Sequence, residues 1–158
     1  MNKKIIIIGG VAAGMSAASK AKRIDKSLDI TVYEMTDAMS WGACGLPYYV
    51  GDFYPDASLM VARTYEEFQK EGINVKIKHK VENVDFKNKK VFVRNLNENK
   101  VFEDSYDELV IATGASSTSP KDIKNLDAEG VYHLKTFNEG LEVKKEMMKK
   151  ENENIIII

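Results

Sequence analysis

The sequence predicts an α/β fold in which a parallel β-sheet carries an inserted antiparallel β-meander. The first observation is a β-branched run at residues 5–8, followed by a segment rich in small residues and by a second candidate strand, DITVYE, at 29–34. This order and spacing are those of a βαβ unit of about 30 residues. The second observation is the alternation of apolar and polar side chains over residues 75–106, interrupted by Asn-rich turns. Such alternation is typical of antiparallel strands.

The first half of the chain supplies the elements of the parallel sheet in order. Residues 5–8 are all isoleucine, and a continuous apolar run of this kind is typical of a strand buried on both faces. Residues 11–25 follow a pair of glycines, and their small and basic side chains favour a helix packed closely on the sheet. A short helix is expected at 64–72, where Gly72 ends it.

The second half predicts one more buried strand and one long helix. The strand is expected at 107–115 and ends in a Gly turn, and residues 137–154 predict an amphipathic helix whose Lys/Glu run is a solvated face. The last four residues, 155–158, repeat the isoleucines of 5–8. We therefore expect one domain at 1–154 and, at 155–158, the first strand of a second βαβ domain that is truncated in this chain. The alternative is a terminal strand added to the edge of the first sheet.

Composition limits the classes of function. The chain has 158 residues and a net charge of −1, with Lys and Arg spread along it. This balance argues against a nucleic-acid-binding or membrane-surface protein. The apolar run near the N-terminus has four residues and ends in two glycines, so we expect neither a signal peptide nor a transmembrane segment of about 20 apolar residues. With a single cysteine, these features favour a reducing, cytoplasmic compartment.

The junction between the first strand and the following helix has the pattern of a phosphate-binding loop. In the dinucleotide fingerprint G-x-G-x-x-G, Gly9 and Gly14 fit the first and third glycine positions. Val11 stands at the second position, where glycine normally lets the backbone approach the pyrophosphate. The rest of the loop is slim, so free N–H groups at the helix start can still face a phosphate. Its small residues are Gly10, Ala12 and Ala13.

Glu34 strengthens this interpretation. It ends the second strand, twenty residues after Gly14, where an acidic side chain accepts hydrogen bonds from the ribose hydroxyls of an adenosine. We therefore predict a Rossmann-like dinucleotide-binding domain, and the loop does not distinguish FAD from NAD. The alternative is a tight strand–helix turn followed by an ordinary exposed glutamate.

The single cysteine, Cys44, lies in the string SWGACGLPYYVGD at residues 40–52. Ser40 is a candidate N-cap, which would place the thiol in the first turns of a helix, where the local positive field favours the thiolate. Pro47 keeps that helix short or kinked. Without a second cysteine, chemistry would pass through a mixed disulfide with a small thiol or through a sulfenic acid. Considered alone, Cys44 also fits a buried structural residue.

Four strings resemble one known family: GGVAAGMSAASKAKRID (9–25), SWGACGLPYYVGD (40–52), ARTYEEF (62–68) and LVIATGAS (109–116). They are similar to the N-terminal FAD-binding part of the pyridine nucleotide-disulfide oxidoreductases. Within that family they look most like the single-cysteine coenzyme A disulfide reductases and NADH:polysulfide or persulfide reductases. The resemblance spans essentially the whole chain, and members are also similar in having a non-glycine residue where Val11 stands. Water-forming NADH oxidases and NADH peroxidases share the serine and the cysteine but usually lack the Leu-Pro-Tyr-Tyr that follows.

The resemblance implies a role for each matching position. Cys44 would be the redox-active nucleophile beside the flavin, Glu34 would hold the adenosine ribose, and the backbone of Val81 would meet the adenine. The pyrophosphate of FAD would be lined by Gly9, Gly10, Val11, Ala12, Ala13 and Gly14, and a second pass of the chain under FAD would be formed by Ala112, Thr113 and Gly114. The positions that would contact coenzyme A as substrate or product are Ser16, Lys20, Arg23 and Ser40.

Some of these assignments have alternatives. Lys20 and Arg23 also fit a simple helix-face charge pair, and Ser40 also fits a pure N-cap. Lys20 and Ala43 differ from what some members carry, which leaves the identity of the thiol substrate open. His79 and His133 are isolated and lack the spacing of metal ligands, so no metal site is expected.

The resemblance also implies an oxidoreductase activity for the flavoprotein. NADH or NADPH on a second βαβ domain would reduce FAD, and FAD would reduce the disulfide held at Cys44. That domain, a second FAD segment and a dimerisation domain would follow residue 158, so we expect a homodimer for the full-length protein and no turnover by this chain alone. Two alternatives stay open: an NADH oxidase or peroxidase that cycles Cys44 through sulfenic acid, and a non-catalytic nucleotide-binding module with a structural cysteine.

Overall fold

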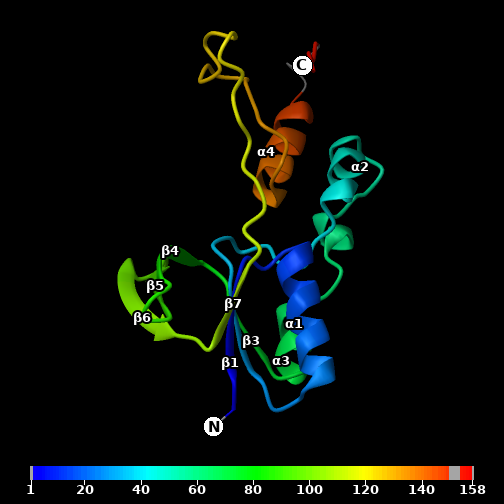
Figure 1. The fold of residues 1–158 in the computed structure, drawn as a ribbon. Helices are drawn as coiled ribbons and strands as arrows, with labels where there is room; N and C mark the ends of the chain where they lie inside the picture. Colours follow the sequence, from blue (N-terminus) through cyan, green and yellow to red (C-terminus); the bar gives the residue numbers. More distant parts are fainter. Residues whose placement is uncertain (1, 150–153, 158) are drawn as a thin grey trace. The chain divides into compact units, whose positions relative to one another are not determined.

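A parallel sheet forms the core of the first of two units in the computed structural model, which describes residues 2–149 and 154–157 (Figure 1). The first unit comprises Met1–Trp41 and Val61–Gly114, and the second comprises Gly42–Met60 and Ala115–Ile158. The predicted phosphate loop therefore belongs to the first unit, and Cys44 belongs to the second.

The sheet of the first unit has four parallel strands in the order β3-β2-β1-β7. They are β1 (Lys4–Ile8), β2 (Asp29–Tyr33), β3 (Ile73–Lys76) and β7 (Glu108–Ile111). The predicted βαβ unit is confirmed, because β1 and β2 pair in parallel and helix α1 (Ala12–Ile24) connects them. Successive strand residues face opposite sides of a sheet, and both Ile6 and Ile7 are buried, as the continuous apolar run predicted.

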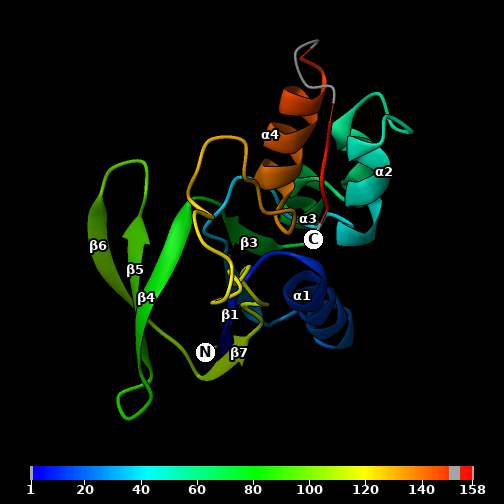
Figure 2. The same ribbon diagram turned by 90° about the horizontal axis from the view of Figure 1, so that it is seen from above.

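The two faces of this sheet are covered by different elements (Figure 1, Figure 2). On one face, α1 and α3 (Tyr65–Lys70) bury a cluster that includes Ile7, Val32 and Phe68. Helix α3 begins at a capping box, in which the Thr64 hydroxyl accepts a hydrogen bond from Glu67 N–H and the Glu67 carboxylate accepts one from Thr64 N–H. The short helix predicted at 64–72 is thereby confirmed.

The other face is covered by an antiparallel meander of β4 (His79–Asp85), β5 (Lys90–Asn95) and β6 (Lys100–Ser105). Val91 and Val93 of β5 pack with Tyr33 of β2 in a second buried cluster, which lies between the meander and the sheet. The predicted meander is confirmed, but its start is corrected, because residues 73–76 form a strand of the parallel sheet. Only a short turn separates the two strands, with Lys78 at a φ of 55°, and the alternation of side chains continues through it. Alternation alone does not locate such a turn.

The second unit contains mainly short helical elements. They are the 3-10 turn η1 (Ala43–Gly45), helix α2 (Leu46–Val50), the 3-10 turn η2 (Ala57–Met60) and helix α4 (Phe137–Met147). Helix α4 begins at a capping box between Thr136 and Glu139. The helix predicted to reach residue 154 ends at Met147, and residues 150–153 lie outside the described part of the chain. The prediction that the Lys/Glu run is a solvated face is wrong for Lys144, which is 8% exposed.

The isoleucines near the end of the chain are exposed where the structure describes them. Residues 154–157 lie in neither helix nor strand, and the side chains of Ile155, Ile156 and Ile157 face solvent, whereas Ile158 lies outside the described residues. A second domain starting at residue 155 therefore stays a prediction. None of the helices in the described part of the chain has the length and apolar character required to cross a membrane.

Candidate functional site

The loop between β1 and α1 is closed by backbone contacts that require glycine. Gly9 has a φ of 106°, and its N–H donates a hydrogen bond of 2.8 Å to the carbonyl oxygen of Tyr33. A Cβ atom on Gly9 would lie 2.3 Å from the carbonyl oxygen of Ala112, and a Cβ atom on Gly14 would lie 1.8 Å from that of Gly9. The end of β7 therefore excludes a side chain at Gly9, and the loop itself excludes one at Gly14.

The start of α1 is open to an anion. Val11 is the N-cap residue, and no side chain caps the helix. Met15 N–H donates the first helical hydrogen bond, 3.2 Å long, to the carbonyl oxygen of Val11. The N–H groups of the preceding turn consequently have no partner within the helix. Ala12 and Ala13 are small and exposed. The helix start thus fits a phosphate or pyrophosphate group, which such N–H groups and the helix dipole attract.

Glu34 is buried directly after β2, with 5% of its surface exposed. Its Oε2 accepts a hydrogen bond of 2.7 Å from Gly10 N–H. Its Oε1 accepts hydrogen bonds from Thr36 N–H at 2.8 Å and from Thr36 Oγ1 at 2.7 Å. The alternative of an ordinary exposed glutamate is therefore wrong. Because a carboxylate oxygen has about two acceptor sites, Oε2 keeps capacity for a ribose hydroxyl.

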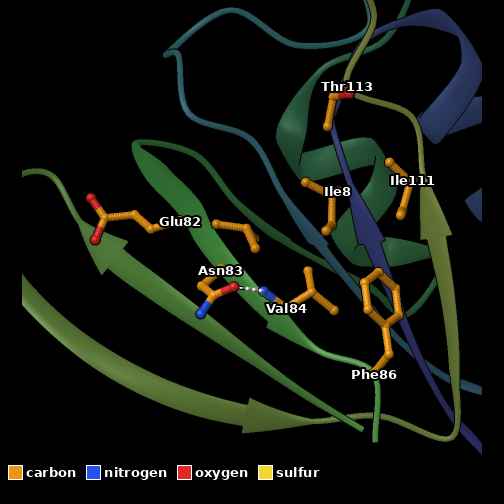
Figure 3. Close-up of a pocket in the computed structure, with 8 residues that line it drawn as sticks. Ile8, Glu82, Asn83, Val84, Phe86, Ile111 and Thr113 are labelled. Carbon is orange, nitrogen blue, oxygen red and sulfur yellow. Dashed lines mark hydrogen bonds between the residues drawn. The ribbon is translucent and has the colours of Figure 1, made fainter.

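The remaining candidate cofactor positions lie where β1, β4 and β7 meet. Ala112 N–H donates a hydrogen bond of 2.8 Å to the carbonyl oxygen of Ile8, so the end of β7 lies beside the end of β1. Gly114 follows at a φ of 65°. Thr113 lines a largely apolar groove of about 340 Å³ (Figure 3). Val81 lines the same groove. Its other lining residues are Ile8, Glu82, Asn83, Val84, Phe86 and Ile111.

Three of the four candidate coenzyme A positions share one exposed face of α1. Ser16, Lys20 and Arg23 stand at i, i+4 and i+7, and each is exposed. The fourth, Ser40, has a φ of 48°, and its N–H donates a hydrogen bond of 2.8 Å to the carbonyl oxygen of Gly10. A backbone hydrogen bond therefore holds Ser40 beside the phosphate loop.

Cys44 lies in η1 of the second unit and is exposed. Within the described residues the thiol is not part of the buried core. The prediction that Ser40 caps the helix of Cys44 is wrong, because the N-cap of η1 is Gly42 and no side chain caps it. The left-handed backbone of Ser40 differs from the extended conformation of an N-cap residue. Helix α2 begins only at Leu46 and has five residues, so the thiol does not lie in a long helix.

Two residues that the sequence analysis missed support these sites. Thr36 holds Glu34 through its N–H and its hydroxyl, and a threonine shortly after an acidic strand end was the available signal. Lys144 donates a hydrogen bond of 2.9 Å to the carbonyl oxygen of Tyr54 and pairs with Asp52, the last residue of the cysteine string. Nothing in the Lys/Glu run of α4 distinguishes Lys144 from its exposed neighbours in the sequence.

Comparison with known proteins matches these features to one family. Residues 3–158 match the sequence model of the pyridine nucleotide-disulphide oxidoreductases. The coenzyme A disulfide reductase of Staphylococcus aureus (strain COL) is 39% identical over 117 residues, which are 73% of this chain and 27% of that protein. The chain therefore spans less than a third of the length of this curated relative.

Solved structures agree with the fold. The NAD-dependent persulfide reductase from A. fulgidus has a TM-score of 0.83 and 38% identity, over 91% of this chain and 26% of that chain. Reduced CoADR-RHD of Bacillus anthracis has a TM-score of 0.90 over 96% of this chain and 27% of that chain. At 24% identity, the second likeness shows the fold alone.

Proposed function

Because the chain belongs to the pyridine nucleotide-disulphide oxidoreductase family, we propose that it is the FAD-binding part of an NAD(P)H-dependent disulfide reductase. The substrate we propose is coenzyme A disulfide or a related polysulfide or persulfide. The observation that carries the proposal is an exposed single thiol, Cys44, in a chain that also carries an open phosphate loop with a buried Glu34. The likeness to a coenzyme A disulfide reductase and to a persulfide reductase supports this substrate class.

The residues present fit FAD. The uncapped start of α1 offers N–H groups to the pyrophosphate, and Oε2 of Glu34 offers an acceptor to a ribose hydroxyl. Val11 does not cap the helix start with its side chain, and the two alanines that follow it are exposed. Bound FAD would carry two electrons from a nicotinamide nucleotide to the disulfide.

Cys44 would act as the nucleophile of thiol–disulfide exchange. Its thiolate attacks one sulfur of the substrate disulfide, the S–S bond of the substrate breaks, and the first thiol leaves as a thiolate. The product of this step is a mixed disulfide between Cys44 Sγ and the second half of the substrate. Two electrons then reduce the mixed disulfide, which restores the Cys44 thiolate and releases the second thiolate, and a proton from solvent completes each free thiol at neutral pH.

Recognition of coenzyme A would use the exposed face of α1. Lys20 and Arg23 carry the positive charges that a phosphate-bearing nucleotide needs, and Ser16 adds a hydroxyl one turn earlier. Ser40 would contribute a further polar group beside the loop. We also propose that the full-length protein is a cytoplasmic homodimer, in keeping with the single cysteine and the family resemblance.

The test is a substrate panel with the complete protein, which by this proposal extends past residue 158. NADH and NADPH are supplied in turn with coenzyme A disulfide, polysulfide, oxygen or peroxide. We expect turnover with a sulfur substrate, no such turnover in Cys44→Ser, and none with the 158-residue chain alone. Turnover with oxygen or peroxide only, or disulfide reduction that survives Cys44→Ser, would overturn the proposal.

A further inference from the structure

Lys144 is a buried cation that the proposed chemistry does not use. Its side chain is 10% exposed, and its Nζ lies 2.9 Å from Asp52 Oδ1 and 2.9 Å from the carbonyl oxygen of Tyr54. It also lies 4.3 Å from the centre of the Tyr49 ring. A buried ammonium group requires such partners, because an unpaired one would be driven back into water. All three partners come from one short segment, residues 49–54, at the end of α2 and just after it.

Asp52 is held in an unusual backbone conformation at this point. Its φ is 63°, a left-handed value that asparagine and aspartate tolerate better than most other side chains. Asp52 N–H donates a hydrogen bond of 3.2 Å to the carbonyl oxygen of Tyr49, and Phe53 N–H donates one of 2.9 Å to that of Tyr48. The turn after α2 thus directs the Asp52 carboxylate toward α4.

A second contact joins the same two helices one turn earlier in α4. A Cβ atom on Gly140 would lie 2.3 Å from Cδ1 of Leu46, so glycine there lets Leu46 approach the helix backbone. Gly140 and Lys144 stand at i and i+4 and share one face of α4, which lies beside α2 (Figure 1, Figure 2). Helix α4 therefore holds α2 at its first residue, Leu46, and beyond its last, at Asp52.

Cys44 lies two residues before Leu46, in the turn η1 that leads directly into α2. We propose that Lys144 and Asp52 are positioning residues for Cys44: their ion pair fixes α2 on α4 and thereby fixes the turn that carries the thiol. The inference rests on the proposed function of Cys44 as the nucleophile. By this proposal Asp52, the last residue of the cysteine string, has a positioning role and takes no part in the thiol–disulfide exchange itself.

The experiment attaches a nitroxide spin label to Cys44, which is the only cysteine of the chain. Lys144→Met keeps a long apolar side chain and removes the ammonium group, and the matched control is Lys145→Met, at an exposed position of the same helix. We expect the rotational correlation time of the label at 25 °C to shorten by about twofold or more in Lys144→Met, because the segment gains motion on the nanosecond scale. It should not change in Lys145→Met. Asp52→Ala should reproduce Lys144→Met, and Asp52→Asn should lie closer to the parent chain, because asparagine keeps an acceptor oxygen and the left-handed preference.

A merely structural role would lower the unfolding temperature of Lys144→Met and leave the label spectrum at 25 °C unchanged, and that result overturns the proposal. If Lys144→Met does not fold, Asp52→Ala decides in the same way, since the Asp52 side chain is largely exposed. In the complete protein, Lys144→Met should lower kcat for disulfide reduction roughly tenfold and leave KM for NADH unchanged. Absence of disulfide reduction in the parent protein would defeat the proposed function, whereas the label spectra would still decide whether Lys144 positions Cys44.

Discussion

Gly10 N–H donates a hydrogen bond of 2.7 Å to Oε2 of Glu34, so the carboxylate expected to bind a ribose also holds the phosphate loop. Both partners lie in the first unit, and the bond is buried. A charge-assisted hydrogen bond of this kind is stronger than a neutral one. Glu34 therefore couples the shape of the loop to the site that would receive the adenosine.

Replacement of Glu34 by glutamine should destabilise the first unit. One oxygen of the carboxylate becomes an NH₂ group, which would face a donor, either Gly10 N–H or Thr36 N–H. A buried donor left without an acceptor costs about 1–3 kcal/mol, and we expect a loss of that size in the free energy of unfolding by urea. The control is Glu98→Gln, whose carboxylate is exposed and makes a long ion pair of 3.5 Å with Lys100. Equal effects of the two substitutions would contradict the role of Glu34.

Replacement of Gly14 by alanine should disrupt the loop rather than the helix. Alanine favours helices over glycine, but its Cβ would lie 1.8 Å from the carbonyl oxygen of Gly9, which is backbone and cannot rotate away. We expect a loss of about 1–3 kcal/mol in unfolding free energy, as for other overpacked sites. Gly42→Ala is the control, because its new methyl would have no neighbour closer than 3.8 Å. Stabilisation by Gly14→Ala would show that this crowding is absent.

Removal of the Tyr33 hydroxyl should loosen the meander from the parallel sheet. Tyr33 donates a hydrogen bond of 2.8 Å to Oδ2 of Asp104 in β6, and Lys4 pairs with the other oxygen of that carboxylate. We expect Tyr33→Phe to lower the free energy of unfolding by about 1 kcal/mol, because Asp104 keeps its lysine partner. Tyr48→Phe, at a half-exposed ring, should have a smaller effect in the same urea titration.

The same hydroxyl should make stability depend on alkaline pH. Burial raises the pKa of Tyr33 above its ordinary value of 10.0, and the hydrogen bond to Asp104 raises that pKa further. Because the folded pKa is the higher one, its stabilisation is complete below pH 10.0 and is lost as the pH rises toward the folded pKa. The fall in unfolding free energy above that pH should be shallower in Tyr33→Phe than in the parent chain. Parallel curves for the two would refute this assignment.

Acid should act on the second unit through Glu139. Burial raises the pKa of this carboxyl, but the hydrogen bonds donated by Thr136 N–H at 2.7 Å and Lys135 N–H at 2.8 Å outweigh it and hold the pKa below the ordinary value of 4.5. The stabilisation is therefore present above pH 4.5 and is lost as the pH falls through the lower folded pKa. The protection of the α4 amides against hydrogen exchange, corrected for the intrinsic exchange rate at each pH, should fall in acid, and Glu139→Gln should flatten that dependence. Glu142→Gln, at an exposed position of α4, serves as the control.

Local sequence patterns predicted the β1–α1–β2 unit and its loop. Gly14 and the acidic residue after β2 follow from short-range requirements, a crowded turn and a buried acceptor. The isoleucines of β1 and Gly9 carry local signals for a buried strand and a tight turn, although distant segments cover that strand and crowd that glycine. Gly14 and Glu34 contact neighbours within the same βαβ unit, so their spacing in the sequence reveals them.

The errors come from contacts between distant segments. Lys144 can be buried because its ammonium group pairs with Asp52 and donates a hydrogen bond to the carbonyl oxygen of Tyr54. Both partners lie about ninety residues earlier in the chain. Ser40 is not an N-cap because its backbone bonds to Gly10, a contact that local cap chemistry does not indicate. The sequence does not reveal the boundary between β3 and β4. The two strands belong to different sheets, but apolar and polar side chains alternate in the same way in both.

The most direct test of the proposed function is the fate of Cys44 after exposure to coenzyme A disulfide without a reductant. In the complete protein, mass spectrometry should find one coenzyme A attached to Cys44 and one released per chain, and NADH should then remove the attached one. Cys44→Ser should acquire none. If the parent protein forms no adduct, or forms one that NADH leaves in place, Cys44 is not the exchanging thiol of this enzyme.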